Sequence, residues 1–312
     1  MGNGNFAKRV LVNWVCIAHA RPLKHILMNN RNFRQMLEAQ WSRGNFVCVG
    51  LDSDFEKIPE ASQRLTDGDG SFLGASIASH IQTFNRAIVK VTKDLVCAYK
   101  FNLAFYGQNK GWIPLRETIT YINEVAPNVP IILDAKYGDN ANSNVKYAGD
   151  AFDYLKADAV TVNPYTGRES FQPFLERKEK GIFVLCRTSN PGAGEFQDLI
   201  VLGQGPLYRV VARRVASEWN KNGNCALVVG ATYPDELREI RGLVGDMPIL
   251  IPGIGAQGGD VEKTVSAGKD SRGYGMIINS SRSIIFASKG ADFAEAARRE
   301  TEKLRDFINQ YR

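Results

Sequence analysis

The sequence predicts an α/β fold in which eight parallel strands close into a single (β/α)8 barrel domain. Short apolar runs alternate with longer amphipathic segments from residue 46 onward, and there are eight such runs. The chain, with 312 residues, also has a length at which α/β barrels form one domain. A doubly wound sheet is the second possibility, and it is disfavoured because no GxGxxG turn follows the first run.

The eight runs are short and continuous, as expected for strands that are buried on both faces. They span residues 46–51, 96–101, 129–133, 159–162, 182–186, 226–229, 249–251 and 275–278. Hydrophobic residues at helical spacing predict helices at 77–93, 114–125, 142–156, 206–221, 234–243, 259–267 and 293–311. A strand followed by a helix at this rhythm implies parallel pairing through right-handed crossovers.

Composition and charge indicate a globular protein with a sizeable core. Hydrophobic residues make up 44% of the chain and charged residues 23%. A net charge of +6 can help to attract a phosphorylated substrate. Lysines and arginines are scattered, without a basic block or an aromatic platform, so we expect no nucleic-acid partner. No run approaches 18 apolar residues, so we expect no membrane span.

Residues 1–30 are predicted to be a non-catalytic extension that precedes the barrel domain at 31–312. Lys8 and Arg9 precede a mildly apolar stretch at 10–18, which suggests a secretion signal. Asn13 interrupts this stretch, which is also short. The remaining chain resembles a cytoplasmic protein, so an extension is the preferred interpretation.

Cysteine usage agrees with a cytoplasmic location. The five cysteines form no CxxC pair, and four of them lie in or beside apolar runs, namely Cys48, Cys97, Cys186 and Cys225. We therefore expect free, buried thiols in a reducing compartment, with neither a disulfide framework nor a zinc site.

The segment directly after the third run carries most of the chemical information. Asp134, Lys136 and Asp139 fall within six positions there. Because side chains alternate along a strand, Asp134 and Lys136 should point the same way, and the aspartate should keep the lysine protonated. The second carboxylate raises the cost of bringing another anion close. A structural salt bridge explains this segment as well as catalysis does, so the other strand ends have to decide.

A barrel enzyme places its active residues on the loops that follow the strands. Polar, charged or Gly-rich segments follow almost every run, namely Asp52-Ser53, Lys100, 134–139, Asn163-Pro164, 187–191, 253–259 and 279–282. This concentration exceeds what loop composition alone would give, and it favours an active site at this end of the barrel.

The segments after the seventh and eighth runs are typical of the phosphate site of a barrel. Gly253 and Gly255 allow backbone N–H groups to approach an anion, and Arg282 can bind it with two hydrogen bonds. Gly258 and Gly259 fit this role too, although turns with positive φ explain them equally well. The long connection at 190–205, with four glycines, is predicted to be a lid that closes on the substrate.

Taken together, six segments resemble the orotidine 5′-monophosphate decarboxylases, and in particular the longer bacterial branch and the malarial enzymes. They are residues 50–54, 100–102, 134–139, 188–191, 252–257 and 281–282. The likeness runs from about residue 31 to the C-terminus, and the segments occur in the expected order on the expected strands. It implies decarboxylation of orotidine 5′-monophosphate to uridine 5′-monophosphate, without a metal or other cofactor.

The resemblance also implies roles for individual residues. A charged catalytic tetrad would consist of Lys100, Asp134, Lys136 and Asp139, with Lys136 as the proton donor. The substrate-binding residues would be Asp52 at the ribose, Ser189 at the pyrimidine, Gln257 and Arg282 at the phosphate, and Pro252 and Ser281. Family enzymes are homodimers with shared active sites, so Asp139 and Ser143 would serve the neighbouring subunit. Three residues depart from the family pattern, namely Tyr137, Asn140 and Ser143.

Three other functions are less consistent with these residues. Mg²⁺-dependent sugar-phosphate decarboxylases and aldolases share the Asp-x-Lys-x-x-Asp run, but they place an acidic metal ligand where this chain has Lys100. A catalytically dead scaffold predicts a broken tetrad, whereas all four members are present. The phosphate-binding barrels of amino-acid biosynthesis share the phosphate segments, but they do not account for Asp134, Lys136 and Asp139.

Overall fold

The protein forms a closed barrel of eight parallel strands in the computed structural model, which describes residues 31–63, 77–107, 112–255 and 260–312. The barrel strands are β1 (Val47–Gly50), β2 (Val96–Asn102), β3 (Ile131–Tyr137), β4 (Ala159–Val162), β5 (Gly181–Arg187), β8 (Cys225–Val229), β9 (Ile249–Pro252) and β10 (Met276–Ser280). Each pairs with its neighbours along the chain, and β10 pairs with β1 to close the ring. The predicted (β/α)8 fold is confirmed.

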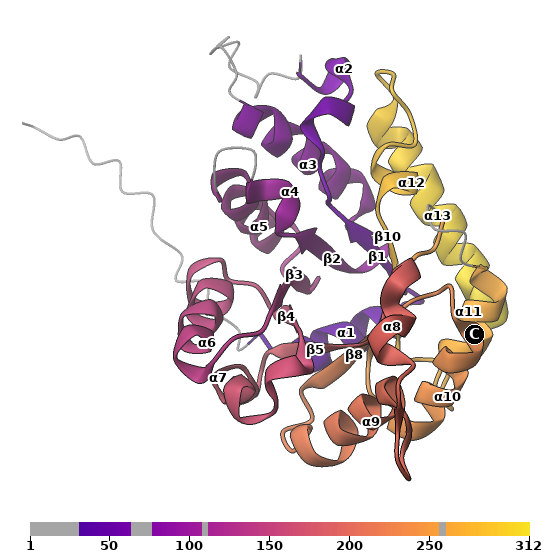
Figure 1. The fold of residues 1–312 in the computed structure, drawn as a ribbon. Coiled ribbons are helices and arrows are strands. Elements are labelled where there is room, and N and C mark those ends of the chain that lie inside the picture. The colour runs from indigo at the N-terminus through magenta and orange to yellow at the C-terminus, as the bar shows by residue number, and fades with distance from the viewer. Residues whose placement is uncertain (1–30, 64–76, 108–111, 256–259) are drawn as a thin grey trace, which may run out of the picture. The chain divides into compact units, whose positions relative to one another are not determined.

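Helices surround this barrel (Figure 1). The main ones are α3 (Ile77–Thr92), α5 (Ile113–Val125), α6 (Ala141–Ala148), α9 (Leu207–Arg214), α10 (Pro234–Val244), α11 (Val261–Gly268) and α13 (Phe293–Tyr311), and shorter ones are α2 (Glu60–Gln63), α4 (Ala104–Gly107), α7 (Gln172–Leu175) and α12 (Arg282–Ile285). The predicted helices at 142–156 and 206–221 are α-helical only in their first parts. They continue as wider π-helical turns at Gly149–Tyr154 and Val215–Trp219. No helix of the described chain is long and apolar enough to cross a membrane.

Strand β3 differs most from its predicted bounds, because it continues to Tyr137 instead of ending at residue 133. Asp134 and Lys136 therefore lie within the strand and do not follow it. Backbone pairing persists here, with Asn102 opposite Asp134 and Val162 opposite Tyr137. The apolar pattern ends at residue 133, because the side chains beyond it reach the open end of the barrel. The hydrogen bonds between the strands continue past that point.

Helix α1 (Phe33–Trp41), which the sequence did not predict, covers the amino ends of the strands. The Phe33 ring lies so close to Gly181 that a Cβ there would be 2.4 Å from it. Trp41 is fully buried and donates from its indole nitrogen to the Met276 carbonyl oxygen at 2.8 Å. This end of the barrel is therefore closed, which leaves the carboxyl ends of the strands for chemistry.

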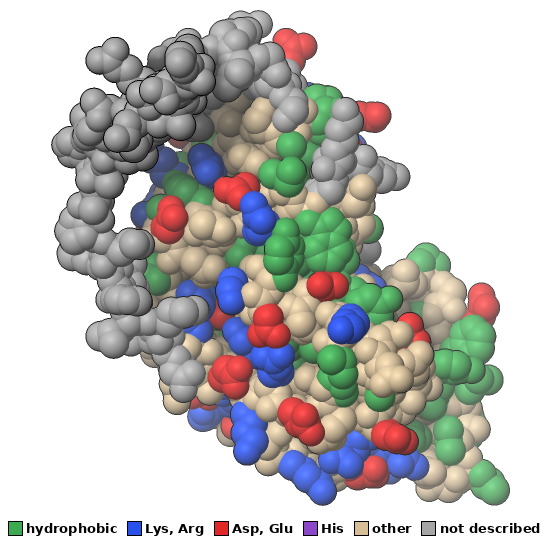
Figure 2. Space-filling model, turned by 90° about the vertical axis from the view of Figure 1, so that its left-hand side faces the viewer, with side chains coloured by type: hydrophobic (Ala, Val, Ile, Leu, Met, Phe, Trp, Pro, Cys, Tyr) green, Lys and Arg blue, Asp and Glu red, His purple; other side chains and the backbone are tan. Residues whose placement is uncertain are grey.

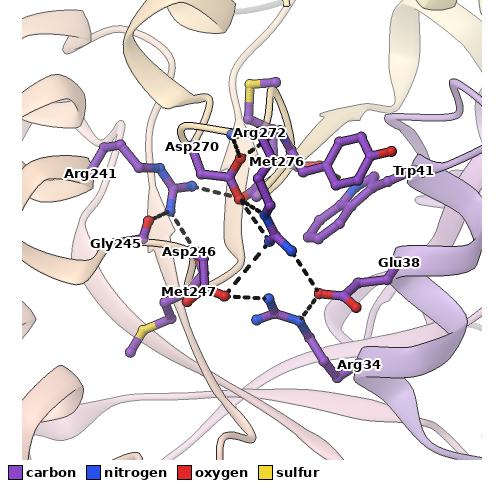
Figure 3. Close-up of polar contacts among 12 residues, drawn as sticks. Arg34, Glu38, Trp41, Arg241, Gly245, Asp246, Met247, Asp270, Arg272 and Met276 are labelled. Carbon is purple, nitrogen blue, oxygen red and sulfur yellow. Dashed lines mark hydrogen bonds and ion pairs between the residues drawn. The ribbon is translucent and has the colours of Figure 1, made fainter.

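A network of ion pairs joins α1 to the two loops that precede β9 and β10 (Figure 3). Glu38 pairs with Arg34 and Arg272, and Asp246 pairs with the same two arginines. Nearby, the buried Arg241 donates to four carbonyl oxygens, those of Gly245, Met247, Gly268 and Gly275. These contacts hold the loops at the closed end in one arrangement.

Arg31 forms a second anchor at this end. Its guanidinium donates to both carboxylate oxygens of Asp158, at 2.8 and 2.6 Å, and Asp158 is fully buried. The Asp158 carboxylate also accepts from the Ile131 backbone N–H at 2.9 Å. The pair thus ties the first described residue of the chain to the starts of β3 and β4.

We expect Arg31→Ala to lower the free energy of unfolding by about 3 kcal/mol, because it leaves a buried carboxylate without its main partner. This is a small loss of stability for breaking a buried ion pair, because Lys180, 3.9 Å from Asp158, remains as a second positive charge. Urea unfolding monitored by circular dichroism measures it. Arg238→Ala, which breaks an exposed pair, is the control and should change stability by less than about 0.5 kcal/mol. Equal effects of the two substitutions would show that the Asp158 anchor is unimportant.

Residues 31–312 form one compact unit. The predicted extension at 1–30 lies outside the described residues, so the division of the chain into extension and barrel stays a prediction. The cysteines within the described ranges are Cys48, Cys97, Cys186 and Cys225, and all four are buried free thiols.

Candidate active site

A chain of alternating charges crosses the open end of the barrel over β1, β2 and β3. The Lys100 ammonium donates to Asp52 Oδ1 at 3.3 Å and to Asp134 Oδ2 at 3.2 Å, although Lys100 itself is only 4% exposed. Lys136 donates to the other oxygen of Asp134 at 2.7 Å. Strand register produces this arrangement, because Lys100 lies opposite Gly50 on one side and Ile132 on the other.

The two lysines differ in their surroundings. Lys100 is enclosed between carboxylates, whereas the Lys136 side chain is 49% exposed and reaches toward the open end. The Lys136 backbone has φ 52°, a left-handed conformation that non-glycine residues rarely adopt. Strain of this kind persists only where surrounding contacts hold it, and it is frequent at functional sites.

Charge pairing decides the protonation of this array. Burial raises the pKa of the Asp134 carboxyl, but Lys100, Lys136 and a hydrogen bond from Thr161 outweigh burial and lower it to about 2. Burial likewise lowers the pKa of the Lys100 ammonium, yet Asp52 and Asp134 more than reverse this and raise it above its ordinary value. Near neutral pH, Asp134 is therefore an anion and Lys100 a cation.

A cavity of about 200 Å³ opens beside this array. Six predicted site residues line it, namely Asp52, Lys100, Asp134, Pro252, Ser281 and Arg282. Arg282 is exposed and forms no ion pair with a described residue, so its guanidinium is available to an anion. The cavity thus joins the charged array of β1–β3 to the predicted phosphate segments after β9 and β10.

Two kinds of glycine shape this cavity. Gly50 allows β1 and β10 to approach each other, since a Cβ there would lie 1.9 Å from Ser281 Oγ. Gly253 and Gly255 have φ values of 107° and 84°, which side-chain-bearing residues rarely adopt. The predicted role of Gly253 and Gly255 as backbone donors fits this geometry. Gln257, Gly258 and Gly259 lie outside the described residues.

Four described residues that were predicted for the site do not line the cavity, namely Lys136, Asp139, Ser143 and Ser189. Lys136 is joined to it through its bond to Asp134. Asp139 lies beyond β3, and its carboxylate accepts from the Asn140 backbone N–H at 2.6 Å. Ser143 lies in the first turn of α6. Ser189 follows β5 and packs against Gly230, where a Cβ would be 2.8 Å from the Ser189 Cβ. Within one chain, the fourth member of the predicted tetrad is therefore separate from the other three.

Two of the residues that depart from the family pattern, Asn140 and Tyr137, have structural roles. Asn140 is the N-cap of α6, and its side chain accepts from the Ser143 N–H at 3.1 Å. Tyr137 is largely buried and stacks on Tyr147 of α6 with ring centroids 4.3 Å apart. Both residues therefore fix α6 against β3, and neither lines the cavity.

Asn102, Asn279 and Thr161 also belong to the site. Asn102 and Asn279 fall in the predicted segments 100–102 and 279–282 but were given no role there, and Thr161 was not predicted. Asn102 lines the cavity, and its backbone N–H donates to Asp52 at 3.3 Å. Asn279 also lines it, is buried, and has a side-chain oxygen without a partner among the described residues. Thr161 bonds to both Asp134 and Lys136. A polar residue inside an otherwise apolar strand is the signal that would have found Thr161.

The predicted lid is folded into short elements, namely a 3-10 turn (Pro191–Ala193), α8 (Gly194–Gln197), β6 (Ile200–Val201) and β7 (Gly205–Pro206). Its base is anchored by Gln197, which accepts from the Thr188 N–H at 2.9 Å and donates to the Thr188 hydroxyl at 3.1 Å. Its tip is exposed and apolar, with Leu202 97% exposed. A segment that is hydrogen-bonded at its base and exposed at its tip can move as a lid. Its closure over the substrate stays a prediction.

Within the described ranges, no three His, Cys, Asp or Glu residues are grouped so as to hold a metal ion. The ammonium of Lys100 lies between Asp52 and Asp134, at the place where two carboxylates would otherwise attract a divalent cation.

Known proteins resemble this chain over most of its length. A family model described as "Orotidine 5'-phosphate decarboxylase / HUMPS family" matches residues 45–299. The chain is 49% identical to the orotidine 5′-phosphate decarboxylase of Ralstonia nicotianae over 281 residues, which covers 90% of this chain and 99% of that protein.

This chain belongs to the orotidine 5′-phosphate decarboxylase / HUMPS family.

Other proteins named as decarboxylases of this family also resemble the chain. The orotidine 5′-phosphate decarboxylase of Cellvibrio japonicus is 47% identical over 279 residues, covering 89% of this chain and 98% of that protein. The structure of Leishmania donovani OMP decarboxylase matches with a TM-score of 0.71 and 34% identity, covering 88% and 99% of the two chains. Plasmodium berghei orotidine 5′-monophosphate decarboxylase has a TM-score of 0.72, but at 22% identity it shows the shared fold alone. The predicted resemblance to this family is confirmed.

Proposed function

We propose that this decarboxylase-family protein converts orotidine 5′-monophosphate to uridine 5′-monophosphate and CO₂, the last step of de novo pyrimidine synthesis. The observation that carries the proposal is the Lys100–Asp134–Lys136 array beside a cavity that ends at Arg282. Family membership and 49% identity to a named orotidine 5′-phosphate decarboxylase support it. The buried free thiols fit the predicted cytoplasmic location.

The proposed chemistry is a direct decarboxylation. The bond between C6 and the carboxylate breaks, CO₂ leaves, and the electron pair remains on C6 as a carbanion. Lys136 lies on the open side of Asp134, so its ammonium can stabilise this charge and then transfer a proton to C6. Lys100 holds Asp134 from the opposite side, which keeps the carboxylate beside Lys136.

Substrate binding is proposed to use the two ends of the cavity. Asp52 would hold the ribose, while Ser281 and Arg282 would hold the phosphate beside Pro252, together with Gln257. Ser189 would contact the pyrimidine once the lid has closed. Phosphate lies far from C6, so binding energy gained there can close the lid and exclude water, and its loss should lower turnover as well as affinity.

The complete tetrad is proposed to form in a homodimer. Among the described residues the Asp139 carboxylate bonds only to Asn140, and Asp139 directly precedes α6, which contains Ser143. Exposed apolar side chains flank this region, with Ile113, Val145 and Tyr154 each more than half exposed. On the face that includes this side of the barrel, hydrophobic side chains lie among charges of both signs (Figure 2). A partner that covers this face would bring its Asp139 and Ser143 to the neighbouring site.

The alternative is a Mg²⁺-dependent sugar-phosphate decarboxylase or aldolase, a group that the family description also covers. Lys100 opposes it, because a fixed ammonium between Asp52 and Asp134 repels a divalent cation.

The test is the ultraviolet absorbance of orotidine 5′-monophosphate mixed with the purified protein, with and without excess EDTA. We expect complete conversion to uridine 5′-monophosphate at the same rate in both samples. Conversion that EDTA abolishes would contradict the metal-free reaction proposed for this site. A folded protein that converts none of the substrate would contradict the proposed function.

A further inference from the structure

The pairing of β3 with β4 is irregular at the segment that carries Asp134 and Lys136. The two strands pair regularly at Leu133 with Val160, and they pair again at Tyr137 with Val162. Three residues of β3 therefore stand opposite one residue of β4, and that residue is Thr161. Such a bulge removes backbone hydrogen-bond partners from the longer strand, so its N–H groups need other acceptors.

The hydroxyl of Thr161 supplies one of these acceptors. It accepts from the Lys136 backbone N–H at 2.9 Å and lies 2.9 Å from Asp134 Oδ1. Because the N–H can only donate, the single hydroxyl proton is directed to the carboxylate. Thr161 is 1% exposed, so water does not compete for either bond.

These bonds close a ring that holds Lys136 at both ends. Its backbone is bound to Thr161, Thr161 is bound to Asp134, and the Lys136 ammonium is bound to the same oxygen of Asp134 at 2.7 Å. The ring includes the left-handed backbone of Lys136, which would otherwise relax toward an ordinary strand conformation. The Lys136 side chain would then leave the direction in which its ammonium meets the Asp134 carboxylate at the edge of the cavity.

We propose that Thr161 is a positioning residue, whose hydroxyl sets the direction of the Lys136 side chain and the orientation of the Asp134 carboxylate. This inference rests on the proposed function, in which Lys136 donates the proton. Valine would fill the same volume and would match the buried Val160 and Val162 beside it. A threonine here therefore contributes its hydroxyl rather than its shape.

Three variants test the role of the hydroxyl. Thr161→Val removes it with little change of volume, and Thr161→Ser keeps it. Thr301→Val is the matched control, because Thr301 is also fully buried and donates to a backbone carbonyl in α13 at 2.7 Å. Thermal unfolding of all three verifies folding and shows whether losing a buried hydroxyl costs the same stability at both positions.

We expect Thr161→Val to lower kcat at least about tenfold with KM changed less than about threefold, because misplacing a reacting group slows the chemical step. Substrate binding uses the phosphate and ribose contacts, which this change leaves in place. Thr161→Ser should restore kcat to within about threefold of the unmodified protein, and Thr301→Val should leave it unchanged. Equal kcat for Thr161→Val and Thr301→Val would overturn the inference.

A second measurement does not depend on turnover. Acetic anhydride labels free lysine amines, and mass spectrometry of peptides gives the labelling rate at Lys136. We expect Thr161→Val to raise that rate several-fold, since the ammonium loses its fixed pairing with Asp134, while Thr301→Val has no effect. An unchanged labelling rate would overturn the inference even in an active enzyme. If orotidine 5′-monophosphate is not converted at all, the proposed function fails, and the labelling rate alone decides the role of Thr161.

Discussion

Replacing Lys136 by alanine should lower kcat for orotidine 5′-monophosphate by at least about 100-fold, the scale expected when one transition-state donor is removed. The carbanion at C6 has little resonance stabilisation, so its formation depends on a nearby positive charge. Lys136 is the half-exposed cation that faces the open end of the barrel, whereas Lys100 is enclosed between Asp52 and Asp134. Without Lys136, the carbanion loses both its counter-charge and its proton source.

The measurement is initial velocity by ultraviolet absorbance, with EDTA present throughout. Lys90→Ala, which removes an exposed lysine on α3, is the control and should keep full activity. Lys136→Arg separates the two roles, since arginine keeps the charge but does not release a proton near neutral pH. A Lys136→Ala enzyme with activity within tenfold of the unmodified protein would rule out this lysine as the proton donor.

Mixing two inactive variants should restore activity if the active sites are shared. Lys136→Ala and Asp139→Asn should each be inactive alone. After joint refolding, about half of the dimers are mixed under random pairing, and each mixed dimer has one complete site, so about a quarter of full activity should return. The physical basis is that Asp139 is bound within its own loop and does not line the cavity of its own chain.

The matched control for this experiment is a mixture of Lys136→Ala with Lys100→Ala. Both lysines belong to the site of their own chain, so no pairing of these subunits yields a complete site, and no activity should return. Size-exclusion chromatography establishes that mixed dimers are present. Inactive mixtures of Lys136→Ala and Asp139→Asn, in a sample shown to contain dimers, would place Asp139 in the site of its own chain.

Local patterns in the sequence were sufficient for the barrel and for much of the site. Alternating apolar runs and amphipathic segments predicted the eight strands because burial on both faces leaves a continuous apolar run. Asp52, Lys100, Asp134 and Arg282 were predicted to meet since the carboxyl ends of parallel strands lie at one end of a barrel. Their shared cavity confirms that they meet, and their catalytic and binding roles stay predictions.

Contacts between residues far apart in the sequence decided the length of β3, the position of α1 and the role of Thr161. Strand β3 extends to Tyr137 through hydrogen bonds to β2 and β4, which no apolar pattern records. Helix α1 is fixed by its contacts with β5 and β10. In the sequence Thr161 is an ordinary strand residue. In the structure the bulge in β3 places its hydroxyl against Asp134 and the Lys136 backbone. The sequence by itself determined which residues carry charge and near which strand ends they lie. Only the tertiary structure decided how those charges are oriented, because orientation depends on register and on single hydrogen bonds across strands.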